Sequence, residues 1–214
     1  MDWPQIQTAL AACPVVPVLS IPRIEQAEPL AKALAAGGIT ASEITLRTEA
    51  GLPSIDVFKA SAPGMVVGMG TVLDQEDLGA SVAAGADFIV SPGFDQALLK
   101  ALSACPIPVF PGVATAGEAM AARNAGINRV KLFPAEIVGG AKMIKGLGGP
   151  LQDLAFMPTG GVTPGNMGEY LSLKNVYAVG GTWIAKPEHL EAGDWQGITQ
   201  RARAACDAAK ALRE

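Results

Sequence analysis

The chain has 214 residues, of which 50% are hydrophobic, and its formal net charge at pH 7 is -4. No apolar run approaches the roughly 20 residues that a membrane helix needs, and the first residues lack the basic and apolar regions of a secretory signal. Basic residues are scattered rather than clustered, so the sequence predicts no nucleic-acid partner and no membrane association.

Short runs rich in Val, Ile and Phe alternate along the chain with longer, alanine-rich amphipathic stretches. The short runs have the length and composition of buried parallel strands, and the longer stretches have helical spacing. In chain order we expect a helix in "DWPQIQTALAA", a strand at 15–21, a helix at 25–38, strands at 41–47 and 65–70, a helix at 74–85, strands at 87–91 and 107–112, a helix at 115–126, strands at 129–133 and 154–160, a helix at 163–173, a strand at 176–181 and a helix at 194–213.

Capping signals support several of these helices. The helix at 25–38 ends in two glycines, which is typical of a C-cap. Asp74 is a good N-cap, and Thr115 with Glu118 three residues later forms a capping-box pattern. Thr163, followed by proline, predicts the start of the helix at 163–173.

Eight strands alternating with helices predict an α/β fold, a (β/α)8 TIM barrel with an extra N-terminal helix. A doubly wound open sheet is the alternative. Because no linker or low-complexity segment interrupts the pattern, we expect a single domain over residues 1–214.

The three cysteines and the single histidine predict neither a metal site nor a catalytic triad. Cys13, Cys105 and Cys206 are far apart, odd in number and form no CxxC pair. We therefore expect reduced thiols, as in a cytoplasmic protein, rather than a disulfide framework. His189 follows Pro187 in an expected surface loop, which favours a solvated residue without a catalytic role.

Lys131 is unusual because it lies between Val130 and Leu132 in the apolar run "RVKLFPAE". In a barrel, active sites form at the carboxyl ends of the strands, where this run ends. Loss of hydration disfavours the charged form of an amine, and a neutral amine can attack a carbonyl to form a Schiff base. The alternative is a structural lysine that pairs with a buried carboxylate.

Glu43 is the second unusual residue. It shares strand parity with Thr45 and Arg47, so all three side chains should point into the barrel, with Arg47 nearest the mouth. A buried carboxylate is costly unless it is paired or acts as an acid or base. A proton shuttle beside the Schiff base and a structural ion pair are compatible interpretations.

The remaining polar positions at the strand ends suggest an anionic ligand. Two glycine pairs, at 160–161 and 180–181, follow the last two strands, where barrels commonly bind phosphate through backbone N–H groups. Arg47 can hold a carboxylate through its planar fork, and Thr71 can add a hydroxyl donor; the alternative for Arg47 is an exposed rim residue. Together with Lys131 these groups favour a phosphorylated 2-oxo acid as substrate, with an iminium as the electron sink for carbon–carbon cleavage.

The chain resembles the 2-dehydro-3-deoxy-6-phosphogluconate (KDPG) aldolase family, which also includes 4-hydroxy-2-oxoglutarate (KHG) aldolases. The resemblance covers nearly the whole chain. It rests on the segments "PVVPVLSI", "AGGITASEITLRTE", "VGMGTVL", "FIVSPGF", "PVFPGVAT", "KLFPAE", "PTGGVTPGN" and "VGGTWIA".

The resemblance implies roles for individual residues. Lys131 matches the Schiff-base lysine and Glu43 the general acid/base, and Arg47 with Thr71 matches the groups that bind the substrate carboxylate. Further residues match positions that line the pocket or contact substrate and phosphate: Pro92, Phe133, Thr159, Gly160, Gly161, Gly181 and Thr182. The family commonly has serine at position 182; threonine keeps the hydroxyl and adds a methyl group, which can alter how strictly phosphate is required.

The resemblance also implies a function. We expect a class I lyase of the Entner–Doudoroff pathway that cleaves KDPG to pyruvate and glyceraldehyde 3-phosphate, with no cofactor and no metal. A cytoplasmic homotrimer is implied as well. Cleavage of 4-hydroxy-2-oxoglutarate to pyruvate and glyoxylate stays open, because one pocket can serve both substrates, and so does the stereochemical preference at C4.

Two other classes of protein are alternatives. A sugar-phosphate epimerase or isomerase would share the barrel and the phosphate site but would not need the lysine of the sixth strand. A non-catalytic sugar-phosphate-binding barrel would keep the glycine pairs and Arg47, with no use for an apolar-flanked lysine beside a buried glutamate.

Overall fold

The computed structural model describes residues 2–212, and its strands all pair in parallel. The strands are β1 (Val15–Leu19), β2 (Ala41–Thr45), β3 (Val66–Gly70), β4 (Phe88–Val90), β5 (Val109–Phe110), β6 (Gly112–Val113), β7 (Arg129–Leu132), β8 (Ala155–Pro158) and β9 (Val179–Gly181). Six of them form a sheet in the order β5-β4-β3-β2-β1-β9, and three form a sheet in the order β6-β7-β8.

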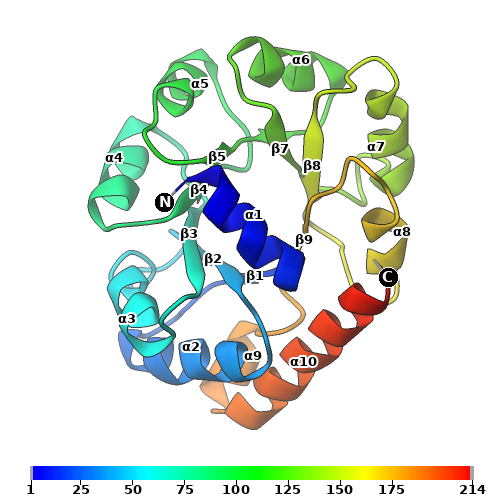
Figure 1. Cartoon of the computed structure of the whole chain (residues 1–214). Helices are drawn as coiled ribbons and strands as arrows, with labels where there is room; N and C mark the ends of the chain where they lie inside the picture. Colours follow the sequence, from blue (N-terminus) through cyan, green and yellow to red (C-terminus); the bar gives the residue numbers. More distant parts are fainter. Residues whose placement is uncertain (1, 213–214) are drawn as a thin grey trace.

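Helices surround these strands, so the architecture is α/β with a curled parallel sheet (Figure 1). The helical elements are α1 (Trp3–Ala12), the 3₁₀ turn η1 (Ile24–Gln26), α2 (Ala27–Ala36), α3 (Ser54–Ser61), α4 (Gln75–Ala83), α5 (Gln96–Ser103), α6 (Ala116–Asn124), α7 (Gly140–Gly148), α8 (Met167–Leu171), α9 (Pro187–Glu191) and α10 (Trp195–Ala211). No helix in the described part of the chain is long and apolar enough to cross a membrane.

Proline interrupts the predicted strand at 107–112. The structure has two short strands there, β5 and β6, on either side of Pro111. Proline has no N–H to give to a neighbouring strand, although its carbonyl still accepts a hydrogen bond from the backbone N–H of Lys131 at 2.9 Å. Isolated parallel bridges, between Phe156 and Val176 and between Thr159 and Gly180, connect the β8 region with the β9 region.

The predicted helices are present but shorter than expected. Asp74 caps α4 by accepting a hydrogen bond from the Asp77 N–H at 2.9 Å, and the capping box of Thr115 and Glu118 begins α6. The start predicted at Thr163 is wrong, because α8 begins only at its residue 167. The helix predicted at 194–213 ends at residue 211, and residue 213 lies outside the described residues.

Helices α3, α5, α7 and α9 are additional to the predicted set. The glycines of α7, among them Gly140 and Gly146, lower its helical propensity. The segment of α9 was expected to be a loop; His189 lies in this helix, half-buried, and its Nδ1 accepts a hydrogen bond from the Lys186 N–H at 3.1 Å.

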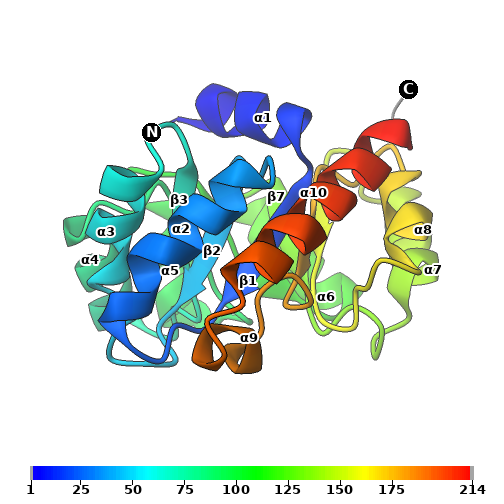
Figure 2. The ribbon, with the colours of Figure 1, turned by 90° about the horizontal axis from the view of Figure 1, so that it is seen from below.

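Helix α1 directly precedes β1, so the chain leaves it next to the amino end of that strand. There it covers the amino ends of the strands (Figure 2). Its buried residues Ile6 and Leu10 belong to an apolar cluster with strand side chains. The strand side chains of that cluster are Val16, Ala41, Val66, Phe88, Val90, Phe110, Met157 and Ala178. This cluster fills the space below the carboxyl ends of the strands and leaves the carboxyl ends as the accessible side of the sheet.

The structure corrects the expectation that the cysteines are reduced. Cys13, just ahead of β1, and Cys206 in α10 are joined as a disulfide, with their Cα atoms 5.3 Å apart. They are separated by 193 positions in sequence, so no local spacing pattern could indicate the pairing. Cys105 is a free thiol, and burial raises its pKa.

Candidate active site

Lys131 and Glu43 face each other from β7 and β2. The Nζ atom of Lys131 donates to Glu43 Oε1 at 3.0 Å and lies 3.4 Å from Oε2. Lys131 is 4% exposed and Glu43 is 1% exposed. Two neighbours of Lys131, Val130 and Leu132, belong to the larger apolar cluster that packs against the helices, so strand alternation directs the lysine to the interior.

The surroundings of the Lys131 amine combine one carboxylate with an apolar wall. Glu43 is its hydrogen-bond partner at 3.0 Å. The ring of Phe133 lies 5.2 Å from Nζ and adds an apolar wall. Below the pair, burial raises the pKa of the Tyr177 phenol well above its usual value; Arg129 opposes this and the charge of Glu43 adds to it. Tyr177 is therefore neutral at physiological pH.

A cavity of about 230 Å³ opens onto Lys131. The structure brings eight of the predicted site residues together in its lining, which consists of Arg47, Lys131, Phe133, Thr159, Gly160, Gly161, Gly181 and Thr182, together with Val18 and Val162. Arg47 lies just beyond the end of β2 and is exposed, so it is a rim residue that still faces the cavity.

Three predicted site residues do not line this cavity. Glu43 lies behind Lys131 and reaches it through the hydrogen bond described above. Thr71 and Pro92 are half-buried next to the ends of β3 and β4, and Thr71 has a left-handed φ of 62°.

Sequence reasoning missed Val18 and Val162, which complete the cavity wall. Val18 shares strand parity with Val16, whose side chain lies in the interior cluster, and that alternation is the signal that could have identified it. Val162 follows the glycine pair in an irregular loop, where no periodic signal exists.

The glycine pair after β8 has the backbone geometry that only glycine adopts easily. Gly160 and Gly161 have φ values of 94° and 82°. Next to them, the Oγ1 atom of Thr159 is buried without a hydrogen-bond partner among residues 2–212. Gly180 leaves the room for Thr159, since a Cβ on Gly180 would lie 2.3 Å from that Oγ1. A buried hydroxyl without a protein partner at a cavity wall is suited to a ligand.

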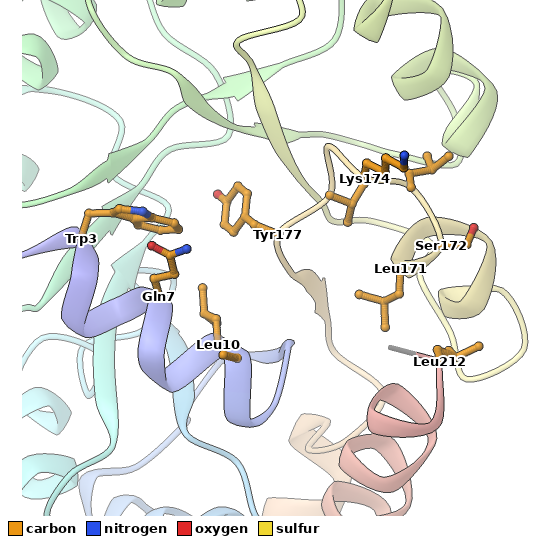
Figure 3. A pocket seen from close by; sticks show the side chains of 11 residues that line it. Trp3, Gln7, Leu10, Leu171, Ser172, Lys174, Tyr177 and Leu212 are labelled. Atoms are coloured by element: carbon orange, nitrogen blue, oxygen red, sulfur yellow. The ribbon is translucent and has the colours of Figure 1, made fainter. Parts of the chain in front are cut away.

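A larger pocket, of about 460 Å³, lies at the opposite, amino end of the strands (Figure 3). Trp3, Leu10, Tyr177 and Leu212 contribute to its lining, and Lys174 is the only charged residue that residues 2–212 place in it. Within the described part of the chain, this pocket has no carboxylate next to its lysine, whereas the smaller cavity opens onto the hydrogen-bonded pair of Lys131 and Glu43, so the smaller cavity is the candidate active site. Within residues 2–212, no group of three His, Cys, Asp or Glu side chains is placed to hold a metal ion.

Known proteins of one family are similar to this chain over most of its length. The family model for KDPG and KHG aldolases matches residues 6–201. The KHG/KDPG aldolase of Escherichia coli is 43% identical over 204 residues, which cover 95% of this chain and 96% of that protein. The 2-dehydro-3-deoxy-phosphogluconate aldolase of Pseudoalteromonas atlantica is 47% identical over 199 residues, or 93% of both chains.

A solved structure shows the same relationship in three dimensions. The KDPG aldolase of Legionella pneumophila, crystallised with pyruvate captured as a covalent carbinolamine intermediate, superposes with a TM-score of 0.89 and 40% identity. The alignment covers 94% of this chain and 97% of that structure. These matches place the protein among the aldolases, which are carbon–carbon lyases. Within that class, the chain belongs to the KDPG and KHG aldolase family.

Proposed function

We propose that this protein is a class I aldolase that cleaves KDPG to pyruvate and glyceraldehyde 3-phosphate through a Schiff base on Lys131. The observation that carries the proposal is the buried pair of Lys131 and Glu43, 3.0 Å apart beside a cavity of about 230 Å³. The covalent pyruvate intermediate captured in the Legionella pneumophila relative supports the same chemistry.

The first half of the reaction joins substrate to enzyme. The carboxylate of the substrate binds Arg47, with the hydroxyl of Thr71 as a second donor. Lys131 passes a proton to Glu43, its hydrogen-bond partner, and the resulting neutral amine attacks the C2 ketone and gives a carbinolamine. Glu43, directly or through a water, protonates the departing hydroxyl, water leaves and an iminium forms.

The second half breaks the carbon–carbon bond. Glu43, now a carboxylate, accepts the proton of the C4 hydroxyl, directly or through a water, as the C3–C4 bond breaks. The electron pair of that bond moves into the iminium and gives an enamine, and glyceraldehyde 3-phosphate leaves. Protonation of the enamine at C3 and hydrolysis then release pyruvate and restore Lys131.

The phosphate of the substrate binds at the carboxyl ends of β8 and β9, where Gly160, Gly161, Gly181 and Thr182 line the cavity. Left-handed glycines allow backbone N–H groups to approach an anion without a Cβ in the way. Phe133 contributes an apolar part of the cavity wall. Thr159, with its buried Oγ1, contacts the substrate between the two ends.

Cleavage of 4-hydroxy-2-oxoglutarate is a second candidate activity. It needs the same amine and carboxylate but no phosphate loop. The Escherichia coli relative carries both activities in its name.

The fold and assembly complete the proposal. The bridges between the β8 and β9 regions, with β5 and β6 on either side of Pro111, support a closed (β/α)8 barrel that spans residues 1–214 as a single domain. The family resemblance supports a cytoplasmic homotrimer.

Reductive trapping tests the chemistry directly. Borohydride with pyruvate should add a covalent mass to the protein, and peptide mapping should place it on Lys131. Lys131→Ala should lose both trapping and turnover. A Lys131→Ala protein that still traps pyruvate would overturn the assignment. The kcat/KM values for KDPG and 4-hydroxy-2-oxoglutarate, measured side by side, decide between the two substrates.

A further inference from the structure

Two residues outside the cavity form a hydrogen bond next to the glycine pair at 160–161. The phenol of Tyr170, in α8, donates to Oε1 of Glu136, which is exposed in the loop after β7. Tyr170 itself is 1% exposed, so the hydrogen bond is anchored in the core. Burial and the nearby Glu136 carboxylate raise the pKa of Tyr170, which keeps the phenol a donor. Neither side chain lines the cavity.

The loop after β7 and the glycine pair run side by side. The backbone N–H of Ala135 donates to the carbonyl of Thr159 at 2.8 Å, and the N–H of Glu136 donates to the carbonyl of Gly160 at 3.1 Å. A shift of Glu136 therefore shifts the backbone that precedes Gly161.

The side chain of Glu136 also packs directly onto Gly161. A Cβ on Gly161 would lie 2.4 Å from Cγ of Glu136, so the glutamate occupies the space that any other residue would need. Gly140 in turn leaves room for the hydrogen bond, because its added Cβ would lie 3.1 Å from the Tyr170 hydroxyl and 3.3 Å from Glu136 Oε1.

A second side chain holds Gly161 at its carbonyl. The Nδ2 group of Asn166 donates to the carbonyl of Gly161 at 3.0 Å, and Oδ1 of Asn166 accepts from the Thr163 N–H at 2.7 Å. Gly161 is thus held by Asn166 through its carbonyl and by the stem of Glu136 through packing. Tyr170 fixes the end of that stem.

We propose that Glu136 and Tyr170 are positioning residues that hold Gly160 and Gly161 in the conformation that binds the substrate phosphate, and so set the preference for phosphorylated substrates. The inference rests on the proposed function. Backbone N–H donors bind an anion well only when their directions are fixed in advance. Loss of the phenol would free Glu136 to move into solvent and loosen this loop, whereas Lys131 and Glu43, on β7 and β2, would keep their geometry.

The test uses two isosteric variants and a matched control. Tyr170→Phe removes only the hydroxyl, and Glu136→Gln removes only the charge. Glu169→Gln removes an equivalent charge from an exposed residue of α8 that is adjacent to Tyr170 in sequence. For each protein, kcat and KM are measured with KDPG, and the pyruvate concentration that gives half-maximal borohydride trapping is measured separately.

A hydrogen bond to a charged group is worth roughly a 10- to 100-fold change in an equilibrium constant, and only part of this reaches a ligand that the bonded residues do not touch. We therefore expect KM for KDPG to rise about three- to tenfold in Tyr170→Phe, and by a smaller but measurable factor in Glu136→Gln, whose amide oxygen accepts a weaker, uncharged hydrogen bond. The kcat value and the pyruvate half-saturation should be unchanged in both. The double variant should be no worse than Tyr170→Phe alone, since both changes act on one hydrogen bond. Glu169→Gln should match the wild type in every measurement.

Other results would overturn the inference. An unchanged KM for KDPG in both variants would show that the hydrogen bond does not act on the phosphate loop. An equal loss for KDPG and pyruvate would show a general structural role. Because Glu136 is exposed, Glu136→Gln keeps the test valid if Tyr170→Phe does not fold. Failure of the wild type to trap pyruvate would instead contradict the proposed function, and the two failures are therefore distinguishable.

Discussion

The carboxylate of Glu43 occupies the space that a side chain on residue 70 would need. Gly70 ends β3, next to β2, and a Cβ added to it would lie 2.2 Å from Oε1 of Glu43. A buried carboxylate beside Lys131 thus depends on the absence of a side chain on the neighbouring strand.

Gly70→Ala should therefore displace Glu43 from Lys131 and lower kcat. If Glu43 moves the protons of the reaction, its misplacement should cost on the order of 10²-fold, at the lower end of general acid–base effects. Steady-state kinetics with KDPG measure the loss. Gly79→Ala is the matched control, because an added Cβ in α4 meets nothing within 4 Å and should leave kcat unchanged. Full activity in Gly70→Ala would contradict the inferred role of this space.

Glu43→Gln keeps the shape of the side chain but removes its charge and its capacity to accept a proton. We expect turnover to fall about 10²- to 10⁴-fold. The amine of Lys131 remains, so borohydride should still trap pyruvate on this residue, although more slowly. Turnover at the wild-type rate would show that Glu43 is only the structural partner of Lys131.

Ile6→Ala should destabilise the protein without changing the active site. Ile6 is 1% exposed in the cluster below α1, and truncation of such a side chain costs about 2–5 kcal/mol of unfolding free energy. Urea denaturation measures the loss. The exposed neighbour Gln7, changed to alanine, should shift the unfolding free energy by less than about 0.5 kcal/mol. A changed KM for KDPG in the folded Ile6→Ala protein would mean that the amino end communicates with the cavity.

The Cys13–Cys206 disulfide should be detectable by counting thiols. Denatured protein should show one reactive thiol, from Cys105, and reductant should raise the count to three. Cys13→Ala, Cys206→Ala and reduction of the wild type should each lower the unfolding free energy by about 2–5 kcal/mol. Cys105→Ala should keep the sensitivity to reductant. Three reactive thiols without reductant would contradict the pairing.

Local patterns in the sequence were sufficient to predict the approximate strand positions and the buried pair of Lys131 and Glu43. Strand parity and apolar neighbours placed Lys131 and Glu43 in the interior, and their hydrogen bond confirms that they meet. Short-range capping chemistry predicted the starts of α4 and α6 at Asp74 and Thr115, because both depend on residues within one turn.

Features that depend on distant residues could not be predicted. Cys13 and Cys206 meet only after α10 packs near β1, and no spacing rule spans 193 positions. The hydrogen bond between Glu136 and Tyr170 joins the loop after β7 to helix α8, and each residue alone resembles an ordinary surface or core position. The break at Pro111 was visible in the sequence, but the Val and Phe content of its neighbours outweighed it in the strand prediction.

Helix α1 has a consequence for the order in which products depart. The apolar cluster that includes Ile6 and Leu10 of α1 lies at the amino ends of the strands, opposite the cavity at Lys131, so we expect substrate to enter and both products to leave at the carboxyl ends. In the proposed mechanism, the three-carbon acid is still bonded to Lys131 as the enamine when C3–C4 cleavage has already freed the aldehyde. Because hydrolysis of the bond to Lys131 comes last in the proposed chemistry, the aldehyde product should leave the cavity before pyruvate.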